Sequence, residues 1–351
     1  MRLSIKRDEL TRAISAVSKV VESRNVMPIL SHLLIRAEGD DSISITATDL
    51  GIIASARATA NVEATGAICV DAKLFGDIAR KAGGDISIEL KDDRLTVKSG
   101  RSRFALSTLP ADQFPLFGAD DYELEIETDL HALIKSVSFA AGTNDAREML
   151  NGVFLHQKDG RIVVVATDGH RLARRIGDEA PEFEGVIIPT KAASIIPEGV
   201  STVAISREKV RVSSGDIGIT TKLIALNYVD YERVIPVSND KVFVVDRSEM
   251  MQAADRVVSV ASDKARAVKI SIAPGGVHLT ARSDVGEALD EVQADYNGEP
   301  VDVGLNSAYL RDMLSALPAG RVTIAVRESA HPVHIKGEND NWDGTLMPMR
   351  I

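Results

Sequence analysis

The segment "IVVVATDGHRLA", residues 162–173, brings together side chains that could do chemistry. Asp168, His170 and Arg171 fall within four residues, and a carboxylate, an imidazole and a guanidinium that close together can move protons or hold an anion. The same groups also suit a polar turn, because an aspartate side chain accepts hydrogen bonds from nearby backbone amides. The elements around the segment decide between a catalytic site and a turn.

The aspartate belongs to a repeated pattern. "ISITATDLGIIA" (residues 43–54) and "VHLTARSDVGEAL" (residues 277–289) share a β-type alternation that runs into a polar turn. Asp49, Asp168 and Asp284 are 119 and 116 residues apart. His170 and Arg171 do not recur at the matching positions. We therefore predict that Asp168 is a turn residue, and that the residues after it are specific to the middle copy.

Helical spacing flanks each copy of the pattern. Apolar residues share one face over 10–21, 130–137 and 250–257, and in the third stretch Asp246 and Glu249 form a capping pair. Second helices are predicted over 71–84, 189–199 and 306–320, with Pro197 shortening the middle one and Gly320 ending the last. Hairpin turns are predicted at Asp92-Asp93, Ser213-Ser214-Gly215 and Asp340-Asn341. The sequence predicts an α+β chain of three repeated domains, each helix, strands, helix, strands, over residues 1–120, 121–243 and 244–351.

Composition indicates an ordinary globular protein in a reducing compartment. The 351 residues are 44% apolar and 26% charged, with a formal net charge of −10 and one cysteine, Cys69. We expect no membrane span, because the apolar run at 162–166 is far shorter than the ~20 residues that a bilayer requires. The opening "MRLSIKRDEL" lacks the apolar core of a signal peptide, so we expect a cytoplasmic protein.

Catalytic and metal-binding motifs are missing from the sequence. It contains no G-x-S-x-G, no P-loop and no G-x-G-x-x-G. His331 and His334 have metal-like spacing, but Pro332 and the strand-like surroundings favour structural roles. We predict no enzymatic activity, no metal and no cofactor, and keep a hydrolase that uses Asp168 and His170 as an alternative.

Several stretches together resemble one family. They are "MPIL" (27–30), "SGRSRFALSTLP" (99–110), "VATDGHRLA" (165–173), "DYERVIP" (230–236) and "MPMRI" (347–351). With the threefold repeat, the chain resembles the bacterial sliding clamps, the β subunits of DNA polymerase III. The resemblance implies the DNA-clamp fold and a head-to-tail homodimeric ring that encircles duplex DNA without reading its sequence. It also implies a clamp loader and the replicative polymerase as partners.

The resemblance places DNA-facing and dimer-interface residues. The helical segments that would line the ring carry a formal charge of +5, against −15 for the rest of the chain, which suits loose contact with phosphates. The expected DNA-facing residues are Arg24, Lys73 and Arg80. The expected dimer-interface residues are Phe104 and Leu106 on one side, and Ser259 and Val260 on the other.

The resemblance also implies that the segment 162–173 is one wall of a pocket for partner peptides of the form Gln-Leu-x-Leu-Phe. The matching residues are Leu150, Thr167, Gly169, His170, Arg171, Leu172, Arg233, Val234, Met347, Pro348, Met349 and Arg350. Tyr228-Val229 departs from the family's Phe-Pro before "DYERVIP", and Pro332 departs at the pocket edge. A clamp-like scaffold that binds proteins without loading on DNA is a second alternative.

Overall fold

The chain divides into two compact units. A computed structural model describes residues 1–22, 26–39, 41–118, 122–260, 267–338 and 341–350. The first unit comprises Met1–His131 and Ser194–Leu223, and the second comprises Ala132–Ala193 and Ile224–Ile351. None of the helices in these described stretches is long and apolar enough to span a bilayer.

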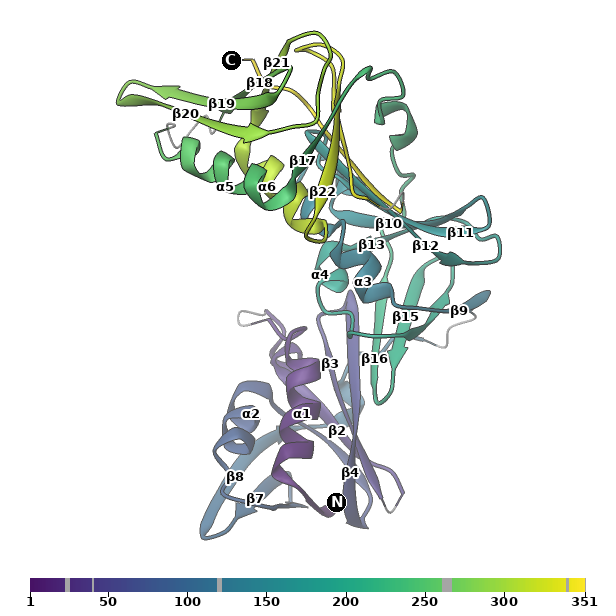
Figure 1. Cartoon of the computed structure of the whole chain (residues 1–351). Helices are drawn as coiled ribbons and strands as arrows, with labels where there is room; N and C mark the ends of the chain where they lie inside the picture. Colours follow the sequence, from purple (N-terminus) through teal and green to yellow (C-terminus); the bar gives the residue numbers. More distant parts are fainter. Residues whose placement is uncertain (23–25, 40, 119–121, 261–266, 339–340, 351) are drawn as a thin grey trace. The chain divides into compact units, whose positions relative to one another are not determined.

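A twelve-stranded sheet dominates the first unit, in the order β1-β6-β7-β8-β5-β2-β3-β4-β16-β15-β14-β9. Strand β4 pairs with β3, β16 and β1, so the first eight strands close on themselves while four more extend the β4 edge (Figure 1). The strands are β1 (Arg2–Ile5), β2 (His32–Ala37), β3 (Ser42–Thr48), β4 (Ile52–Ala64), β5 (Gly66–Asp71), β6 (Ile86–Lys91), β7 (Arg94–Ser99), β8 (Ser102–Leu109), β9 (Leu124–Thr128), β14 (Ser201–Ile205), β15 (Lys209–Ser214) and β16 (Ile217–Lys222).

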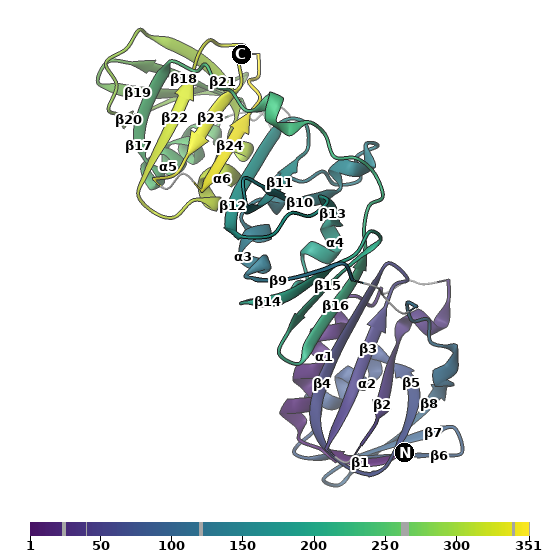
Figure 2. The same cartoon turned by 90° about the vertical axis from the view of Figure 1, so that its right-hand side faces the viewer.

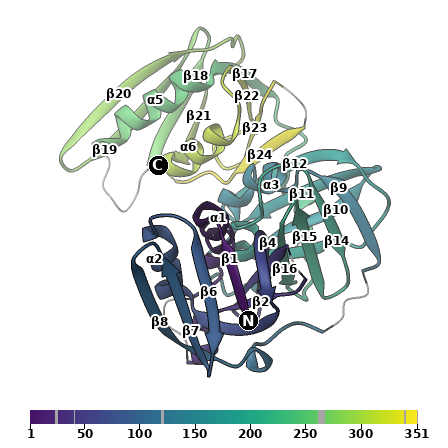
Figure 3. The same ribbon diagram turned by 90° about the horizontal axis from the view of Figure 1, so that it is seen from below.

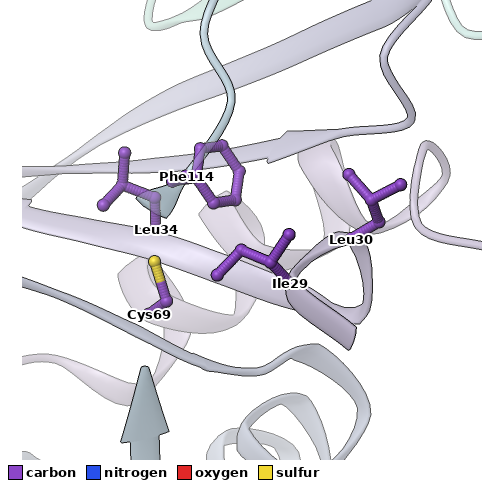
Figure 4. Close-up of a cluster of buried hydrophobic side chains, with 5 residues drawn as sticks. All are labelled: Ile29, Leu30, Leu34, Cys69 and Phe114. Carbon is purple, nitrogen blue, oxygen red and sulfur yellow. The ribbon is translucent and has the colours of Figure 1, made fainter. Parts of the chain in front are cut away.

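Two helices cover this sheet and pack on each other: α1 (Arg7–Ser18) and α2 (Ala72–Lys81). They bury the apolar faces that the sequence predicts, including Leu10, Val17 and Phe75. Asp71 caps α2 by accepting a hydrogen bond from the Leu74 amide at 2.7 Å. Separately from α1 and α2, Cys69 packs with Ile29, Leu30, Leu34 and Phe114 in another apolar cluster (Figure 4).

The second unit contains two antiparallel sheets. An eight-stranded sheet has the order β13-β10-β11-β12-β24-β23-β22-β17, and a four-stranded sheet has the order β20-β19-β18-β21 (Figure 2). The first sheet is built from β10 (Gly152–Lys158), β11 (Arg161–Thr167), β12 (Arg171–Glu179), β13 (Val186–Pro189), β17 (Lys241–Asp246), β22 (Arg321–Val326), β23 (Val333–Lys336) and β24 (Trp342–Leu346). The second is built from β18 (Ala267–Ala273), β19 (Gly276–Ser283), β20 (Gly286–Gln293) and β21 (Val301–Asn306).

The helices of the second unit are α4 (Thr190–Ala193), α5 (Arg247–Val258) and α6 (Ser307–Ala316), and α3 (Leu130–Lys135) lies at the boundary between the units. Helix α5 lies along β19 and β20 (Figure 3). Asp246 caps α5 as the sequence predicts, by accepting from the amides of Ser248 and Glu249. The prediction that Gly320 ends the last helix was wrong, because α6 stops before Pro318, which disfavours helical backbone at the residue preceding it.

The predicted α+β class and the order of helices and strands are confirmed. The Asp92-Asp93 hairpin turn is present, with both residues at positive φ. The turn after β15 places Gly215 at φ +53°. Asp340 in the third predicted turn, and the expected domain boundary at residue 120, lie outside the described residues.

Candidate functional site

Within the segment 162–173, residues 168–170 form the turn between β11 and β12. The Thr167 hydroxyl donates to the Arg171 carbonyl at 2.7 Å and accepts from the Gly169 amide at 3.1 Å. Oδ1 of Asp168 accepts from the amides of His170 and Arg171, at 2.8 and 3.0 Å. The carboxylate therefore fixes its own turn.

The first repeat builds the same turn from the same side-chain types. Thr48 donates to the Ile52 carbonyl at 2.9 Å, and Oδ1 of Asp49 accepts from the Gly51 and Ile52 amides at 2.9 and 2.7 Å. Leu50 takes φ +75°, where Gly169 takes φ +85°. In the third repeat, the Ser283 hydroxyl accepts from the Val285 amide at 3.3 Å. In the first two repeats the aspartate is therefore part of the turn itself.

Arg171 and His170 both lie against α6. The Arg171 guanidinium contacts Oδ2 of Asp168 at 3.1 Å and Oδ2 of Asp312 at 2.6 Å, and lies 4.4 Å from the centre of the Tyr309 ring. The exposed imidazole of His170 stacks on the same ring, with centroids 6.4 Å apart. Asp168 meets the backbone of His170, so the two do not form the aligned acid–base pair that a hydrolase needs.

The turn forms one wall of a cavity of about 270 Å³. The other walls come from segment 147–150, segment 229–234 and strand β24. The lining residues are Arg147, Leu150, Thr167, Gly169, Arg171, Leu172, Val229, Tyr231, Val234, Thr345 and Met347. Gly169 has φ +85°, and a Cβ at this position would lie 2.9 Å from Nη1 of Arg147, so a side chain here would require the guanidinium to shift. Arg147 in turn donates to the Asp168 carbonyl at 3.1 Å, and Asp145 holds its guanidinium.

Tyr231 forms part of the apolar floor of the cavity, and packing and a hydrogen bond to His156 hold it in place. It is buried with Val163, Val165 and Leu172. Nδ1 of His156 faces the Gln157 carbonyl at 3.1 Å and so carries the proton, which leaves Nε2 to accept from the Tyr231 hydroxyl at 3.0 Å. Burial lowers the pKa of His156, and burial together with the Glu232 carboxylate raises the pKa of Tyr231 to about 12. Both rings stay neutral at neutral pH, and the floor is uncharged.

A buried ion-pair network lies beside the cavity on the same face of the sheet. Nε of Arg174 donates to Asp343 at 2.8 Å, and Nε2 of His334 lies 2.9 Å from the same carboxylate. Burial alone would raise the pKa of Asp343, but the hydrogen bond from His334 and the charge of Arg174 outweigh it, and the pKa lies below its ordinary value. This network fixes β12, β23 and β24 next to the cavity.

The structure brings together part of the expected pocket set and places the rest outside the lining. The His170 ring stacks on Tyr309 of α6, Arg233 is exposed and paired with Asp230, and Arg350 is exposed. Met349 lies further along the tail, where its amide donates to the Gly304 carbonyl at 2.8 Å. Pro348, between it and Met347, is not among the lining residues.

Four further residues line the cavity that the sequence did not predict: Arg147, Val229, Tyr231 and Thr345. Tyr231 lies within the family-like stretch "DYERVIP", and Val229 stands where the family usually has proline. Thr345 reaches the cavity because it pairs with Leu172 across β12 and β24. Because that pairing joins residues far apart in the chain, no local sequence pattern predicts it.

The expected DNA-facing and interface residues lie elsewhere. Lys73 and Arg80 are exposed on α2, with Arg80 paired to Asp77, and Arg24 lies outside the described residues. Phe104 is 38% exposed on β8, whereas Leu106 is buried in the sheet core. Ser259 ends α5, and its hydroxyl donates to the Arg256 carbonyl at 2.7 Å, with Val260 following it.

The two histidines with metal-like spacing have separate partners. His334 contacts Asp343, and Nδ1 of His331 lies 3.6 Å from Glu328. Within the described part of the chain, no group of three or more potential ligands is placed to hold a metal ion.

Family comparison covers the chain almost from end to end. Models of the DNA polymerase III β subunit match at residues 1–118 (N-terminal domain), 125–230 (central domain) and 232–350 (C-terminal domain). The chain is 36% identical to the β sliding clamp of Caulobacter vibrioides over 374 aligned residues, and 33% identical to that of Pseudomonas putida over 369. Each alignment covers 100% of this chain and 100% of the relative. The chain belongs to the bacterial sliding clamp family.

Solved structures of the family agree with the fold. The DNA polymerase III β subunit of Pseudomonas aeruginosa aligns at a TM-score of 0.95 and 32% identity, and the clamp of Caulobacter crescentus at 0.93 and 35%. The Bartonella birtlesii clamp, solved with griselimycin bound, aligns at 0.95 and 34%. All three alignments cover 100% of both chains. The fold is therefore the three-domain clamp fold, and the family is the non-enzymatic processivity subunit of DNA polymerase III. Membership implies DNA and polymerase as partners.

Proposed function

We propose that two copies of this chain form a head-to-tail ring around duplex DNA in the bacterial cytoplasm. The ring tethers the replicative polymerase and other proteins through a short peptide motif, and a clamp loader places it on DNA. Each chain contributes three domains, over residues 1–120, 121–243 and 244–351. Ring topology, more than tight binding, keeps the clamp on DNA.

The observation that carries this proposal is the cavity of about 270 Å³ beside the β11–β12 turn. Its lining is mainly apolar, with Leu150, Leu172 and Val234 around an uncharged floor. Met347 adds a flexible thioether side chain, which adapts to differently shaped partners. A cavity of this kind suits apolar anchor side chains of an extended peptide, and nearby polar groups orient the backbone.

Two strand edges support the head-to-tail dimer. Strand β20 is an end strand of its four-stranded sheet and exposes Leu289 to 68%. Strand β8 pairs with β7 along residues 102–107 and with β5 at Thr108 and Leu109, and it exposes Phe104. Exposed edges with apolar side chains invite another strand. Helix α5, with Ser259 as its C-cap, packs on β20, and Arg256 near that end pairs with Asp290 of β20.

Peptide binding tests the proposal directly. A chain lacking residues 347–351 should bind a labelled Gln-Leu-x-Leu-Phe peptide at least ~2 kcal/mol more weakly in fluorescence anisotropy, because Met347 supplies buried contact surface. His170→Ala should weaken binding only slightly, since this exposed imidazole is not part of the lining. The truncated chain should remain dimeric in analytical ultracentrifugation. Wild-type peptide affinity after truncation would rule out the cavity as the docking site.

A further inference from the structure

Thr345 contributes a buried hydroxyl-bearing side chain to the cavity wall. It lies on β24 directly opposite Leu172 of β12, the neighbouring strand in Figure 2. Residues directly opposite each other in an antiparallel pair point to the same face of the sheet. Both line the cavity, and Thr345 is only 1% exposed. Its side chain therefore belongs to the wall that an entering anchor would contact.

The Thr345 hydroxyl is the lining hydroxyl left without a partner. Of the three hydroxyl groups in the lining, that of Thr167 donates to the Arg171 carbonyl and that of Tyr231 contacts His156. Among the described residues, Oγ1 of Thr345 is buried and has no hydrogen-bond partner. A buried polar group without a partner costs free energy, so the hydroxyl favours a bound state that supplies one.

The neighbouring charges indicate which partner is missing. Asp145 holds the Arg147 guanidinium, and Asp168 and Asp312 hold that of Arg171. Both guanidinium groups are already paired with carboxylates, so the cavity does not require an anionic ligand. The threonine hydroxyl can donate one hydrogen bond and also accept, so a neutral side-chain amide, which carries both an acceptor oxygen and N–H donors, complements it.

We propose that Thr345 is a specificity-determining residue, which makes the cavity favour an anchor side chain with a neutral hydrogen-bond acceptor, such as a side-chain amide, over an equally large aliphatic one. This inference rests on the proposed function, because it requires a peptide anchor to enter the cavity. A leucine anchor would leave the buried hydroxyl without a partner. An asparagine anchor of similar volume would accept its hydrogen bond.

The test compares wild type and Thr345→Val with three labelled peptides. They are Gln-Leu-x-Leu-Phe and its two variants in which one leucine is replaced by asparagine. Valine keeps the shape of threonine and removes the hydroxyl. For the anchor that meets Thr345, the ratio of the asparagine-peptide Kd to the leucine-peptide Kd should rise about tenfold in Thr345→Val, as expected for losing one buried hydrogen bond while relieving one unpaired hydroxyl.

Two further variants make the result specific. Thr345→Ser keeps the hydroxyl and should keep the wild-type ratio, and it also guards against a folding defect in the valine variant. Thr323→Val makes the same chemical change on β22, away from the cavity, and should change nothing. An unchanged ratio in Thr345→Val, or an equal loss for every peptide, would overturn the role of the hydroxyl alone. Failure of all three peptides to bind the wild-type chain would overturn the peptide site as well.

Discussion

Gly169 differs from its counterpart Leu50 in its surroundings more than in its backbone. Both have positive φ, so the turn itself accommodates a side chain in the first repeat. At Gly169 a Cβ would lie 2.9 Å from the Arg147 guanidinium, which is held by Asp145 and by the Asp168 carbonyl. The glycine therefore allows Arg147 to close that end of the cavity.

We expect Gly169→Ala to destabilise the chain by about 1–3 kcal/mol, because the new side chain is held at positive φ and also displaces the Arg147 guanidinium. It should also weaken peptide binding, because Arg147 must move away from the cavity wall. Urea unfolding and anisotropy measure the two effects. In an Arg147→Ala background the same substitution should cost less. An equal cost in both backgrounds would show that backbone strain, and not the guanidinium, requires glycine.

At the scale of an element, the apolar cluster around Cys69 packs on the C-terminal half of β5. Cys69 is fully buried among Ile29, Leu30, Leu34 and Phe114 (Figure 4), and its Sγ lies 3.7 Å from the Pro110 carbonyl. Burial raises the pKa of the Cys69 thiol to about 11. The thiol therefore stays protonated across the neutral range, and its contribution to stability is lost only as the pH rises through the alkaline range toward that value.

This burial predicts an inert thiol in the folded chain. At pH 8, labelling by Ellman's reagent should be slower than in the denatured chain by about a hundredfold from the thiolate fraction alone, and by more when access is included. Phe114→Ala should speed the reaction by loosening the cluster. Leu116→Ala, at an exposed neighbour outside the cluster, serves as the control. Equal labelling rates in the folded and denatured chain would contradict this packing.

Periodicity was enough to predict four of the helices, whereas the helix expected over 189–199 is only Thr190–Ala193, and long-range pairing decided the site. Apolar spacing located α1, α2, α5 and α6, and Asp246 marked the start of α5, because these signals lie within a few residues of one another. The turn role of Asp168 also followed from local repetition. Thr345 could not be found in this way, since only the β12–β24 register brings it opposite Leu172. The resemblance placed Met347 but, like the local patterns, did not include Thr345.

At the scale of the whole molecule, the proposed ring depends on an interface that is separate from each domain core. We expect Phe104→Ala combined with Val260→Asp to convert the dimer to monomer in analytical ultracentrifugation, because both positions lie at the proposed edges while the buried cores are untouched. The monomer should keep the wild-type circular dichroism spectrum. Val237→Asp, at an exposed linker position, should remain dimeric. A double variant that is still fully dimeric would place the interface elsewhere.

Retention on DNA should depend on scattered basic residues and on salt. Lys73→Glu with Arg24→Glu should shorten the time that a loaded clamp stays on circular DNA at low salt, because fewer cations meet the phosphates. Arg207→Glu with Arg211→Glu makes the same change in charge on the β14–β15 hairpin, where each arginine pairs with a glutamate, and should have little effect. Equal effects of the two pairs would mean that net charge alone is responsible.

The matching turns at Thr48–Ile52 and Thr167–Arg171 separate two kinds of evolutionary constraint. Folding restricts the threonine and the aspartate, whose side chains bond the backbone of their own turn. After a duplication, the next three side chains can diverge, provided that the first of them tolerates positive φ. One copy became Leu-Gly-Ile and the other Gly-His-Arg. A docking surface at such a turn can therefore be gained, retuned or lost by point mutation without any change of fold, which makes this position unusually evolvable.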